Sequence, residues 1–278
     1  MKISDEKILK YIMLSEMDGI GPVTQNALLN LTGGVDRCFV TEAEELLLAD
    51  DICSIGMSRL RSFITQRNDR FLREKAETIY EASSKHGIDV IVREDERFPK
   101  RFLDIYSGIR WSDVKTSVDL PIVLYVKGSL RINDFADSIG IVGARRCTPE
   151  GKARAIDISA EAIDKNVAVI SGMAKGIDSY AHTAALRSGG YTIAVLGNGP
   201  DICYPKEHDR LYEEIVGHGC IISEYSPGTE PREYRFPKRN RLIAALSDRL
   251  FVIETGRNSG TKSTVEKAKE YGREVYSL

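Results

Sequence analysis

The sequence is poor in the residues that build disulfide or zinc frameworks. Its 278 residues include five cysteines, an odd number, and no two of them have the C-x-x-C spacing. None of the four histidines completes a zinc-binding pattern with them. We therefore interpret the cysteines as small buried hydrophobic residues in a reducing cytosol, and we expect no metal site.

An excess of charge of one sign is also missing. Lys and Arg together number 39 and Asp and Glu 41, so the formal net charge is -2 at pH 7. This balance excludes a uniformly basic nucleic-acid coat, and any anion site must be a local patch. No apolar run reaches the ~18 residues that suggest a membrane-spanning helix. The start, M-K-I-S-D-E-K, lacks the apolar core of a signal peptide, so the sequence predicts a cytoplasmic protein without a membrane partner.

The sequence divides into two regions of different character. Residues 1–84 predict a small all-helical domain, and residues 85–278 predict an α/β domain. In the first region the turn D-G-I-G-P at 18–22 resembles a helix–hairpin–helix module, whose backbone N–H groups bind a DNA phosphate. A helical packing domain without DNA contacts is the alternative. Residues 104–120, which hold the single tryptophan Trp111, have no clear period and predict an insertion or loop.

The second region alternates short apolar runs with helical patterns. Between residues 138 and 182 the order is strand, turn, helix, strand, turn, helix, with Thr148 as an N-cap and Pro149 at the first helical position. This pattern predicts a doubly wound, largely parallel sheet, with ligands at the carboxyl ends of its strands. The expected strands are 88–92, 122–126, 139–142, 167–170, 191–196, 220–223, 250–253 and 274–276.

Six motifs in this region resemble one known family, DNA-processing protein A (DprA, also called Smf). The helical region is similar to the N-terminal part of the family, less specifically. The motifs are I-V-G-A-R (141–145), S-G-M-A-K-G-I-D (171–178) with A-H (181–182), T-I-A-V-L-G (192–197), Y-P-K (204–206), S-E-Y-S-P-G-T (223–229) and F-P-K-R-N-R (236–241).

The resemblance implies a Rossmann-like core that binds single-stranded DNA and forms a homodimer. It also implies that the protein protects incoming DNA and loads the RecA recombinase on it in natural transformation. No catalytic activity and no cofactor are implied. Many members of the family continue into a winged-helix domain, and we expect its function to be absent from a chain that stops at Leu278.

The turns after the strands supply the first candidate DNA contacts. Arg145 matches the arginine of the family's G-S-R turn and can clamp a phosphate with two hydrogen bonds, next to Gly143. Ser171 and Gly172 can hold a phosphate through hydroxyl and backbone groups. Two lysines complete this set, Lys175 and, in the Y-P-K motif, Lys206.

Residues 232–241 form the densest basic stretch, and aromatic residues interleave it. Phe236 with Arg235 and Lys238 is the combination expected for single-stranded DNA. An apolar helix is predicted to begin at Asn240 and Arg241. Arg239 and Arg241 therefore have two possible roles, since they either contact DNA or brace the fold. The candidate contacts from this stretch are Arg235, Phe236, Lys238, Arg239, Asn240 and Arg241.

Two polar residues of the second turn are predicted to be structural rather than catalytic. Asp178 is interpreted as the N-cap of its helix. His182 has no second histidine or cysteine partner in the sequence and is interpreted as a packing or hydrogen-bonding residue.

Other functions compete with DNA binding. The stretch 256–263 approaches a P-loop, but Thr261 replaces the glycine that should precede Lys262, which argues against ATP hydrolysis. A Rossmann-like nucleotide sensor, or a nucleotide-hydrolysing enzyme related to LOG-type proteins, is the alternative, supported by Glu224 near a strand end. A third hypothesis is a degenerate member of the family that serves only as a protein-interaction partner.

Residues 259–264 depart from the family pattern. The family has S-G-S-L-I-T where this sequence has S-G-T-K-S-T, so two apolar residues are replaced by polar ones. Either this helix start faces solvent or ligand, or a contact made in the family is lost.

Overall fold

The computed structural model describes residues 3–48, 55–107, 119–255 and 260–278. The chain folds into two compact units. The first comprises Met1–Lys85, Val90–Phe98 and Leu103–Leu124, and the second His86–Asp89, Pro99–Phe102 and Tyr125–Leu278. The sequence predicts a single boundary after residue 84, whereas two later segments of the chain also belong to the first unit.

The first unit is built mainly from helices. Buried side chains such as Ile12, Leu28 and Phe63 form its core. Gly21 caps α2 and Pro22 is the first residue of that helix, where its missing N–H costs no hydrogen bond. The helices are α1 (Asp5–Glu16), α2 (Pro22–Thr32), α3 (Val35–Val40), α4 (Ala43–Leu48), α5 (Met57–Gln66) and α6 (Arg70–Lys85).

A further helix, α7 (Lys100–Ser107), covers the start of the stretch predicted as a loop. Residues 108–118, with Trp111, lie outside the described part of the chain.

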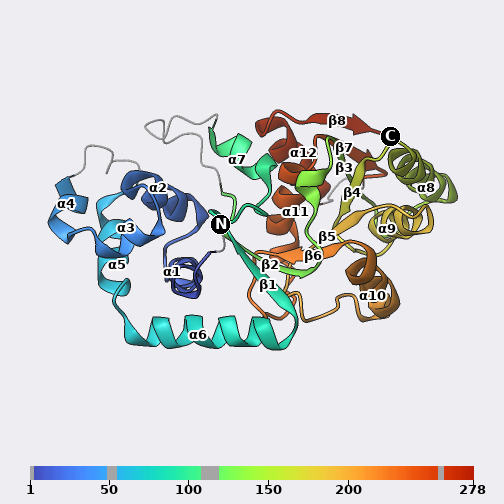
Figure 1. Ribbon diagram of the computed structural model, residues 1–278. Helices are drawn as coiled ribbons and strands as arrows, with labels where there is room; N and C mark the ends of the chain where they lie inside the picture. The colour runs from blue at the N-terminus through green and yellow to red at the C-terminus, as the bar shows by residue number, and fades with distance from the viewer. Residues whose placement is uncertain (1–2, 49–54, 108–118, 256–259) are drawn as a thin grey trace. The chain divides into compact units, whose positions relative to one another are not determined.

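An eight-stranded sheet has the order β1-β2-β6-β5-β4-β3-β7-β8 (Figure 1). Neighbouring strands from β6 to β8 are parallel, and β2 runs antiparallel to β6. The prediction of a doubly wound, largely parallel sheet is confirmed, with all eight strands near their expected positions. The strands are β1 (Ile88–Val92), β2 (Val123–Gly128), β3 (Ser138–Gly143), β4 (Ala168–Ser171), β5 (Thr192–Leu196), β6 (Cys220–Ser223), β7 (Arg249–Ile253) and β8 (Glu274–Ser277).

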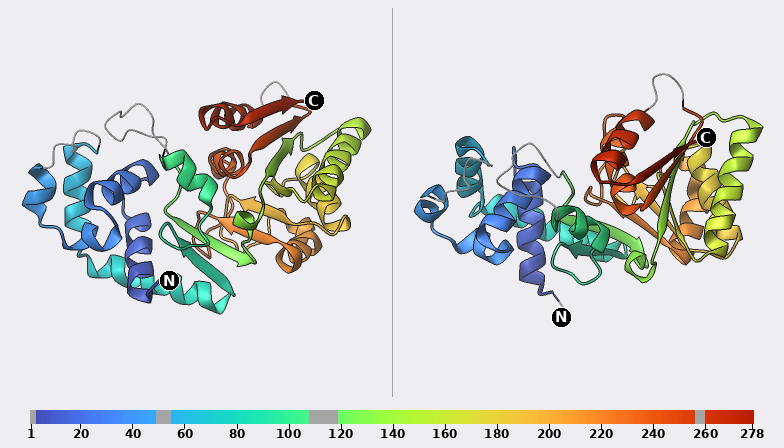
Figure 2. Two further views of the ribbon diagram at one scale, coloured as in Figure 1. Left: turned by 45° about the horizontal axis from the view of Figure 1, so that its top comes forward. Right: turned by 90° about the horizontal axis from the view of Figure 1, so that it is seen from above.

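Helices cover both faces of this sheet (Figure 2). On one face lie α8 (Pro149–Asp164), α9 (Ile177–Arg187) and α10 (Asp209–His218); on the other lie α11 (Arg235–Leu246) and α12 (Thr261–Glu270). Adjacent strands β3 and β7 therefore lead to helices on opposite faces. Such a switch point leaves a crevice outside the carboxyl ends of the two strands, where ligands of open α/β sheets bind.

Local sequence explains where two of these helices begin. Thr148 caps α8 as predicted, because its hydroxyl accepts a hydrogen bond from Gly151 N at 3.1 Å and Pro149 follows it. The prediction that Asp178 caps α9 is wrong. The N-cap is Gly176, which has φ of +79°. A Cβ there would also overlap the carbonyl oxygen of Ala144, so this close approach requires glycine.

The start of α11 also differs from the prediction. The helix begins at Arg235, more than one turn before the predicted Asn240. Pro237 is its third residue, where a missing N–H is tolerated, so the basic stretch is helical from Arg235 onward.

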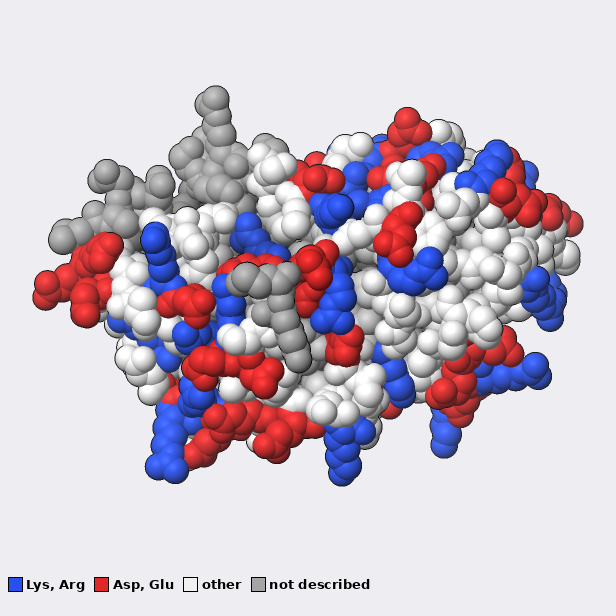
Figure 3. Space-filling view, viewed as in Figure 1, with Lys and Arg blue, Asp and Glu red and all other residues white. Residues whose placement is uncertain are grey.

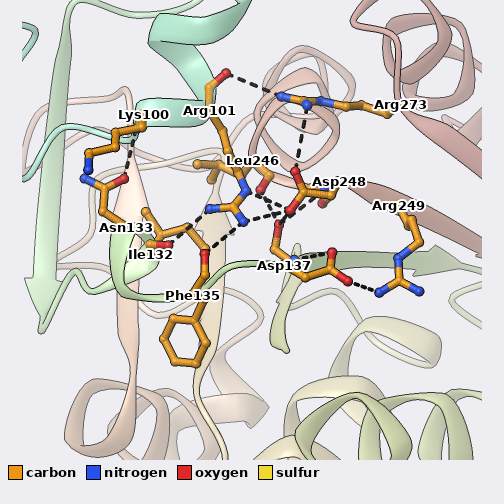
Figure 4. Close-up of polar contacts among 12 residues, drawn as sticks. Lys100, Arg101, Ile132, Asn133, Phe135, Asp137, Leu246, Asp248, Arg249 and Arg273 are labelled. Atoms are coloured by element: carbon orange, nitrogen blue, oxygen red, sulfur yellow. Dashed lines mark hydrogen bonds and ion pairs between the residues drawn. The ribbon is translucent and has the colours of Figure 1, made fainter. Parts of the chain in front are cut away.

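A polar network braces the amino ends of the central strands (Figure 4). The guanidinium of Arg101 donates to Asp248 at 2.7 and 2.9 Å, and Ser138 Oγ donates to the same carboxylate. Burial alone would raise the pKa of Asp248, but Arg101 outweighs it and lowers that pKa. A second pair joins Asp137 to Arg249. These bonds lie at the edge opposite the crevice and fix β3 and β7 beside each other.

Among the helices of the described ranges, none combines the length and the hydrophobicity that a membrane span requires.

Candidate nucleic-acid interface

A cleft of about 690 Å³ opens at the crevice between β3 and β7. Its wall combines the turn after β3 with the first turn of α11 and the start of α12. A smaller hollow of about 70 Å³ adjoins it and shares Arg145, Ala174, Phe236 and Arg239 with it. The cleft is lined by Val142, Gly143, Ala144, Arg145, Ala174, Asp178, Glu233, Phe236, Pro237, Arg239, Asn240, Gly260 and Thr261.

Arg145 presents its charge at the mouth of this cleft. It is exposed, directly follows Ala144 in the turn after β3, and lies over the ring of Phe236, 5.9 Å from the ring centroid. Within the described residues its guanidinium forms no ion pair. Gly143 makes this turn possible, because a Cβ there would overlap the carbonyl oxygen of Ile253 on β7. A guanidinium in this position can bind a phosphate through two N–H groups.

Two stacked rings stand beside Arg145. Tyr204 and Phe236 have ring centroids 5.4 Å apart and planes 13° from parallel. Tyr204 is 43% exposed and lines the smaller hollow. The sequence predicts a DNA contact at Phe236 but none at Tyr204, although Tyr204 belongs to the Y-P-K motif. Only the fold shows that the two rings meet.

The floor of the cleft contains a buried cation and a buried carboxylate. Arg239 Nη1 donates to the carbonyl oxygens of Gly172, at 2.8 Å, and of Val195. Burial lowers the pKa of Arg239 to about 10, so it stays charged at neutral pH. Burial also raises the pKa of Asp178, whose carboxylate accepts from Gly172 N and Ala174 N. Arg239 and Asp178 thus place opposite charges in the floor of the cleft, and together they position the loop after β4.

The groups predicted to hold a phosphate at Ser171 and Gly172 are already engaged. Ser171 Oγ donates to the carbonyl oxygen of Ile141 at 2.5 Å, and Gly172 N donates to Asp178. A Cβ at Gly172 would stand 2.6 Å from Arg239 Nη2 and 2.8 Å from the Asp178 carboxylate, so glycine is required. Both residues shape the cleft instead of presenting donors to a ligand.

The two predicted lysines near the cleft differ in their partners. Lys175 lines the smaller hollow and forms an ion pair with Glu207 at 2.6 Å, with both side chains more than half exposed. Lys206 is exposed and opens the 3-10 helix η3 (Lys206–His208) directly after Tyr204 and Pro205. An exposed ion pair is worth little, so a phosphate can displace Glu207 from Lys175.

The basic stretch divides into two groups. Arg239 and Asn240 line the cleft, and Arg239 Nε donates to Asn240 Oδ1 at 3.1 Å. Arg241 instead donates to both carboxylate oxygens of Glu224 at 2.7 and 2.6 Å, and both side chains are nearly buried. Arg241 lies outside the cleft lining, so of the two predicted roles it has the structural one, bracing the fold. The same ion pair also engages Glu224, the acid that supports the alternative of a nucleotide-binding enzyme.

At the start of α11, the side chains of Arg235 and Lys238 both lie close to the ring of Tyr234. Their charged groups are 5.6 and 5.5 Å from the centroid of that ring. Arg235 also lies 5.0 Å from the ring centroid of Tyr225. Lys238 is exposed, and Tyr234 is 56% exposed.

His182 lies in the core behind the cleft. Its Nδ1 is 2.7 Å from Thr192 Oγ1, and the hydroxyl of Thr192 donates to Val169 O. The imidazole must therefore donate from Nδ1. Burial lowers the pKa of His182 to about 3, so the ring is neutral. The prediction of a hydrogen-bonding residue agrees with this geometry.

The N-terminus of α8 is already occupied by a carboxylate of the chain. Glu254, at the end of β7, accepts hydrogen bonds from the backbone N and hydroxyl of Thr148. These bonds lower the pKa of Glu254. In dinucleotide-binding proteins of this fold, the pyrophosphate lies at the turn between the first strand and its helix, which here is the turn between β3 and α8. The carboxylate of Glu254 occupies that position instead.

The altered loop before α12 is described only from Gly260 onward. Residues 256–259, which complete the P-loop-like stretch, lie outside the described ranges. Lys262, one of the two polar replacements of the family pattern, is exposed, and Ser263 donates to Gly260 O at 2.8 Å. This helix start therefore presents polar groups beside the cleft wall at Thr261.

Figure 3 shows basic and acidic side chains intermixed on the face it views. Among the described residues, no group of three or more His, Cys, Asp or Glu could hold a metal ion.

Fold and site together define a Rossmann-like α/β protein with a cationic, aromatic cleft at its switch point. The chain belongs to the DNA recombination-mediator protein A family, which matches residues 89–278. It is 38% identical over 186 residues to the DNA processing protein DprA of Streptococcus pneumoniae, covering 67% of this chain and 64% of the relative. It is 32% identical over 275 residues to protein Smf of Synechocystis, covering 96% and 63%. The chain thus spans less than two thirds of these relatives.

Solved structures agree with the fold. The X-ray structure of DprA from S. pneumoniae has a TM-score of 0.72 and 30% sequence identity, with 100% of this chain and 87% of that chain covered. A structure that describes the single-stranded DNA binding mode of DprA from Helicobacter pylori has a TM-score of 0.59 and 29% identity, covering 69% and 82%.

Proposed function

We propose that this protein binds single-stranded DNA in the cleft at the carboxyl ends of β3 and β7. The observation that carries the proposal is the position of Arg145, exposed beside the stacked rings of Tyr204 and Phe236. A single strand exposes phosphates and base faces together, and cations next to aromatic platforms match both. The H. pylori relative, whose structure describes single-stranded DNA binding, supports the assignment.

The protein acts here by binding and not by catalysis. The two titratable side chains at the cleft floor form hydrogen bonds that stabilise the fold. Asp178 accepts hydrogen bonds from backbone amides, and Arg239 donates to backbone carbonyl oxygens. His182 is neutral and bonded to Thr192. Each of these groups stabilises the loops that form the cleft.

The family adds a role for the bound strand. A member of the DNA recombination-mediator proteins is expected to present single-stranded DNA to the RecA recombinase during natural transformation, as a cytoplasmic homodimer. A strand-exchange assay with the recombinase, with and without this protein, tests that step separately from DNA binding.

The direct test is fluorescence anisotropy of a labelled, unstructured oligonucleotide, with matched duplex as competitor. Arg145→Ala is expected to weaken binding by about 1.5–3 kcal/mol, the range for a hydrogen bond to a charged group. Lys206→Ala is expected to weaken it less, because a lysine binds phosphate as a point charge.

A matched control is Arg131→Ala. Arg131 also lies over an aromatic ring, 6.0 Å from the centroid of Tyr191, but precedes β3 at the opposite edge of the sheet. It should bind DNA like wild type. Absence of binding by a folded wild-type protein would refute the proposal, and a thermal-shift panel of nucleotides would then test the sensor alternative.

A further inference from the structure

Next to the cleft, the start of α11 carries a second set of groups suited to a nucleotide. Tyr234 is the N-cap residue of α11 and exposes 56% of its surface, more than Tyr204 beside the cleft. Two cations, Arg235 and Lys238, lie within 5.6 Å of the centroid of its ring. Tyr234 therefore presents an aromatic face at the surface with two cations beside it, the combination that binds single-stranded nucleic acid.

The surroundings fit one nucleotide of a polyanionic strand. Arg235 Nη1 donates to the carbonyl oxygen of Glu230, and its charge also faces the ring of Tyr225, so the guanidinium has a defined position. Two acids lie close in sequence, Glu230 and Glu233, and Glu233 lines the cleft. Residues 230–238 carry a net charge of +1, because Arg232, Arg235 and Lys238 outnumber these two acids.

Position along the chain connects this set with the cleft. Glu233 and Phe236, the residues on both sides of Tyr234 and Arg235, line the cleft wall. A strand that leaves the cleft past the start of α11 therefore passes close to Tyr234.

We infer that Tyr234, Arg235 and Lys238 form a second nucleotide site outside the cleft, where one base stacks on Tyr234 and its phosphate meets the two cations. This inference rests on the proposed function, because it extends the path of the same strand. A base has a π-face whatever its identity, so the site adds affinity with little sequence preference.

The test compares wild type with Tyr234→Leu on oligothymidylates of roughly 4 to 16 nucleotides, the range of site sizes of single-strand-binding folds. Short oligonucleotides that only fill the cleft should bind both proteins equally. For longer ones, Tyr234→Leu is expected to lose roughly 5- to 150-fold in affinity, the usual effect of removing one stacking platform. Tyr234→Phe, which keeps the ring, should bind like wild type.

A spectroscopic signature separates stacking from a structural role. With 2-aminopurine placed at successive positions of a long oligonucleotide, one position should be quenched by wild type and by Tyr234→Phe but not by Tyr234→Leu. Tyr271→Leu is the matched control, because Lys267 lies 5.7 Å from the Tyr271 ring centroid but Tyr271 follows the other end of α12. It should keep full affinity.

The outcomes distinguish the two proposals. If wild type binds every length and Tyr234→Leu matches it in affinity and in quenching, the second site is refuted and the cleft remains. If wild type binds no length, the proposed function itself fails. An equal loss in Tyr271→Leu would also contradict the second site.

Discussion

The buried imidazole of His182 links the stability of the protein to pH. Its pKa is about 3 in the folded protein because burial disfavours the charged form, against an ordinary value of 6.5. Between these two values the unfolded chain binds a proton that the folded chain does not. Stability therefore falls as pH drops below about 6.5, and this part of the loss is complete below the folded pKa.

We expect wild type to lose about 2 kcal/mol more unfolding free energy than His182→Asn between pH 7 and pH 5. Asparagine can still donate to Thr192, so the variant tests the titration and not merely the hydrogen bond. Urea unfolding at a series of pH values measures the difference. Parallel pH profiles for the two proteins would show that His182 titrates normally.

Single residues also show what the sequence could not reveal. Arg145 can be chosen from the sequence because its turn follows a strand, and in the fold it lines the cleft. Ser171, Gly172 and Arg241 look equally available in the sequence, but in the fold each is bound to a partner of the same chain. The partner of a polar side chain depends on which strand ends meet, and this is a property of the folded chain alone.

Helix α11 is fixed to the end of β6 by one buried ion pair. Arg241 and Glu224 form two hydrogen bonds of 2.7 and 2.6 Å, with side chains 8% and 11% exposed. Removing one partner leaves a poorly solvated charge, whereas removing both does not.

Arg241→Met should therefore cost about 3–5 kcal/mol of stability, and the double variant with Glu224→Met should cost much less than the sum of the single changes. Chemical denaturation of the four proteins measures the coupling. At a temperature where it is folded, Arg241→Met should retain single-stranded DNA affinity. Additive stability losses, or a selective loss of DNA binding, would contradict the structural role.

The elements differ in how well the sequence predicts them. The central strands β3, β4, β5 and β6 appear as apolar runs because both faces of the sheet are covered there, so nearly every residue in them is buried. The edge strand β8, E-V-Y-S, is mostly exposed and gives a weaker signal. The first turn of α11 is not predicted, because Pro237 and the basic residues are typical of a loop. The Tyr204–Phe236 stack joins segments 32 residues apart in the chain, and no local pattern indicates it.

For the molecule as a whole, a net charge of -2 limits electrostatic attraction to the few cations around the cleft. Four cations in the two proposed sites form no ion pair among the described residues and can meet phosphates without breaking one: Arg145, Lys206, Arg235 and Lys238. Each phosphate neutralised on a single strand contributes a slope of about -0.7 to log affinity against log salt.

The expected slope is thus roughly -2.8, or about a 50-fold loss of affinity between 50 and 200 mM salt. Arg145→Gln should reduce the slope by about 0.7. Anisotropy titrations across a salt series measure both values. An affinity independent of salt would exclude phosphate contacts, and a much steeper slope would require cations that lie elsewhere on the protein.

The carboxylate of Glu254 at the start of α8 has a consequence for what the protein can distinguish. A terminal phosphate carries more charge than an internal phosphodiester, and the helix end best suited to that extra charge is filled from within. This turn therefore gives the protein no means of recognising the end of a strand. If the cleft binds single-stranded DNA as proposed, we expect it to bind the middle of a strand through contacts added along the polymer, and to bind a lone nucleotide weakly.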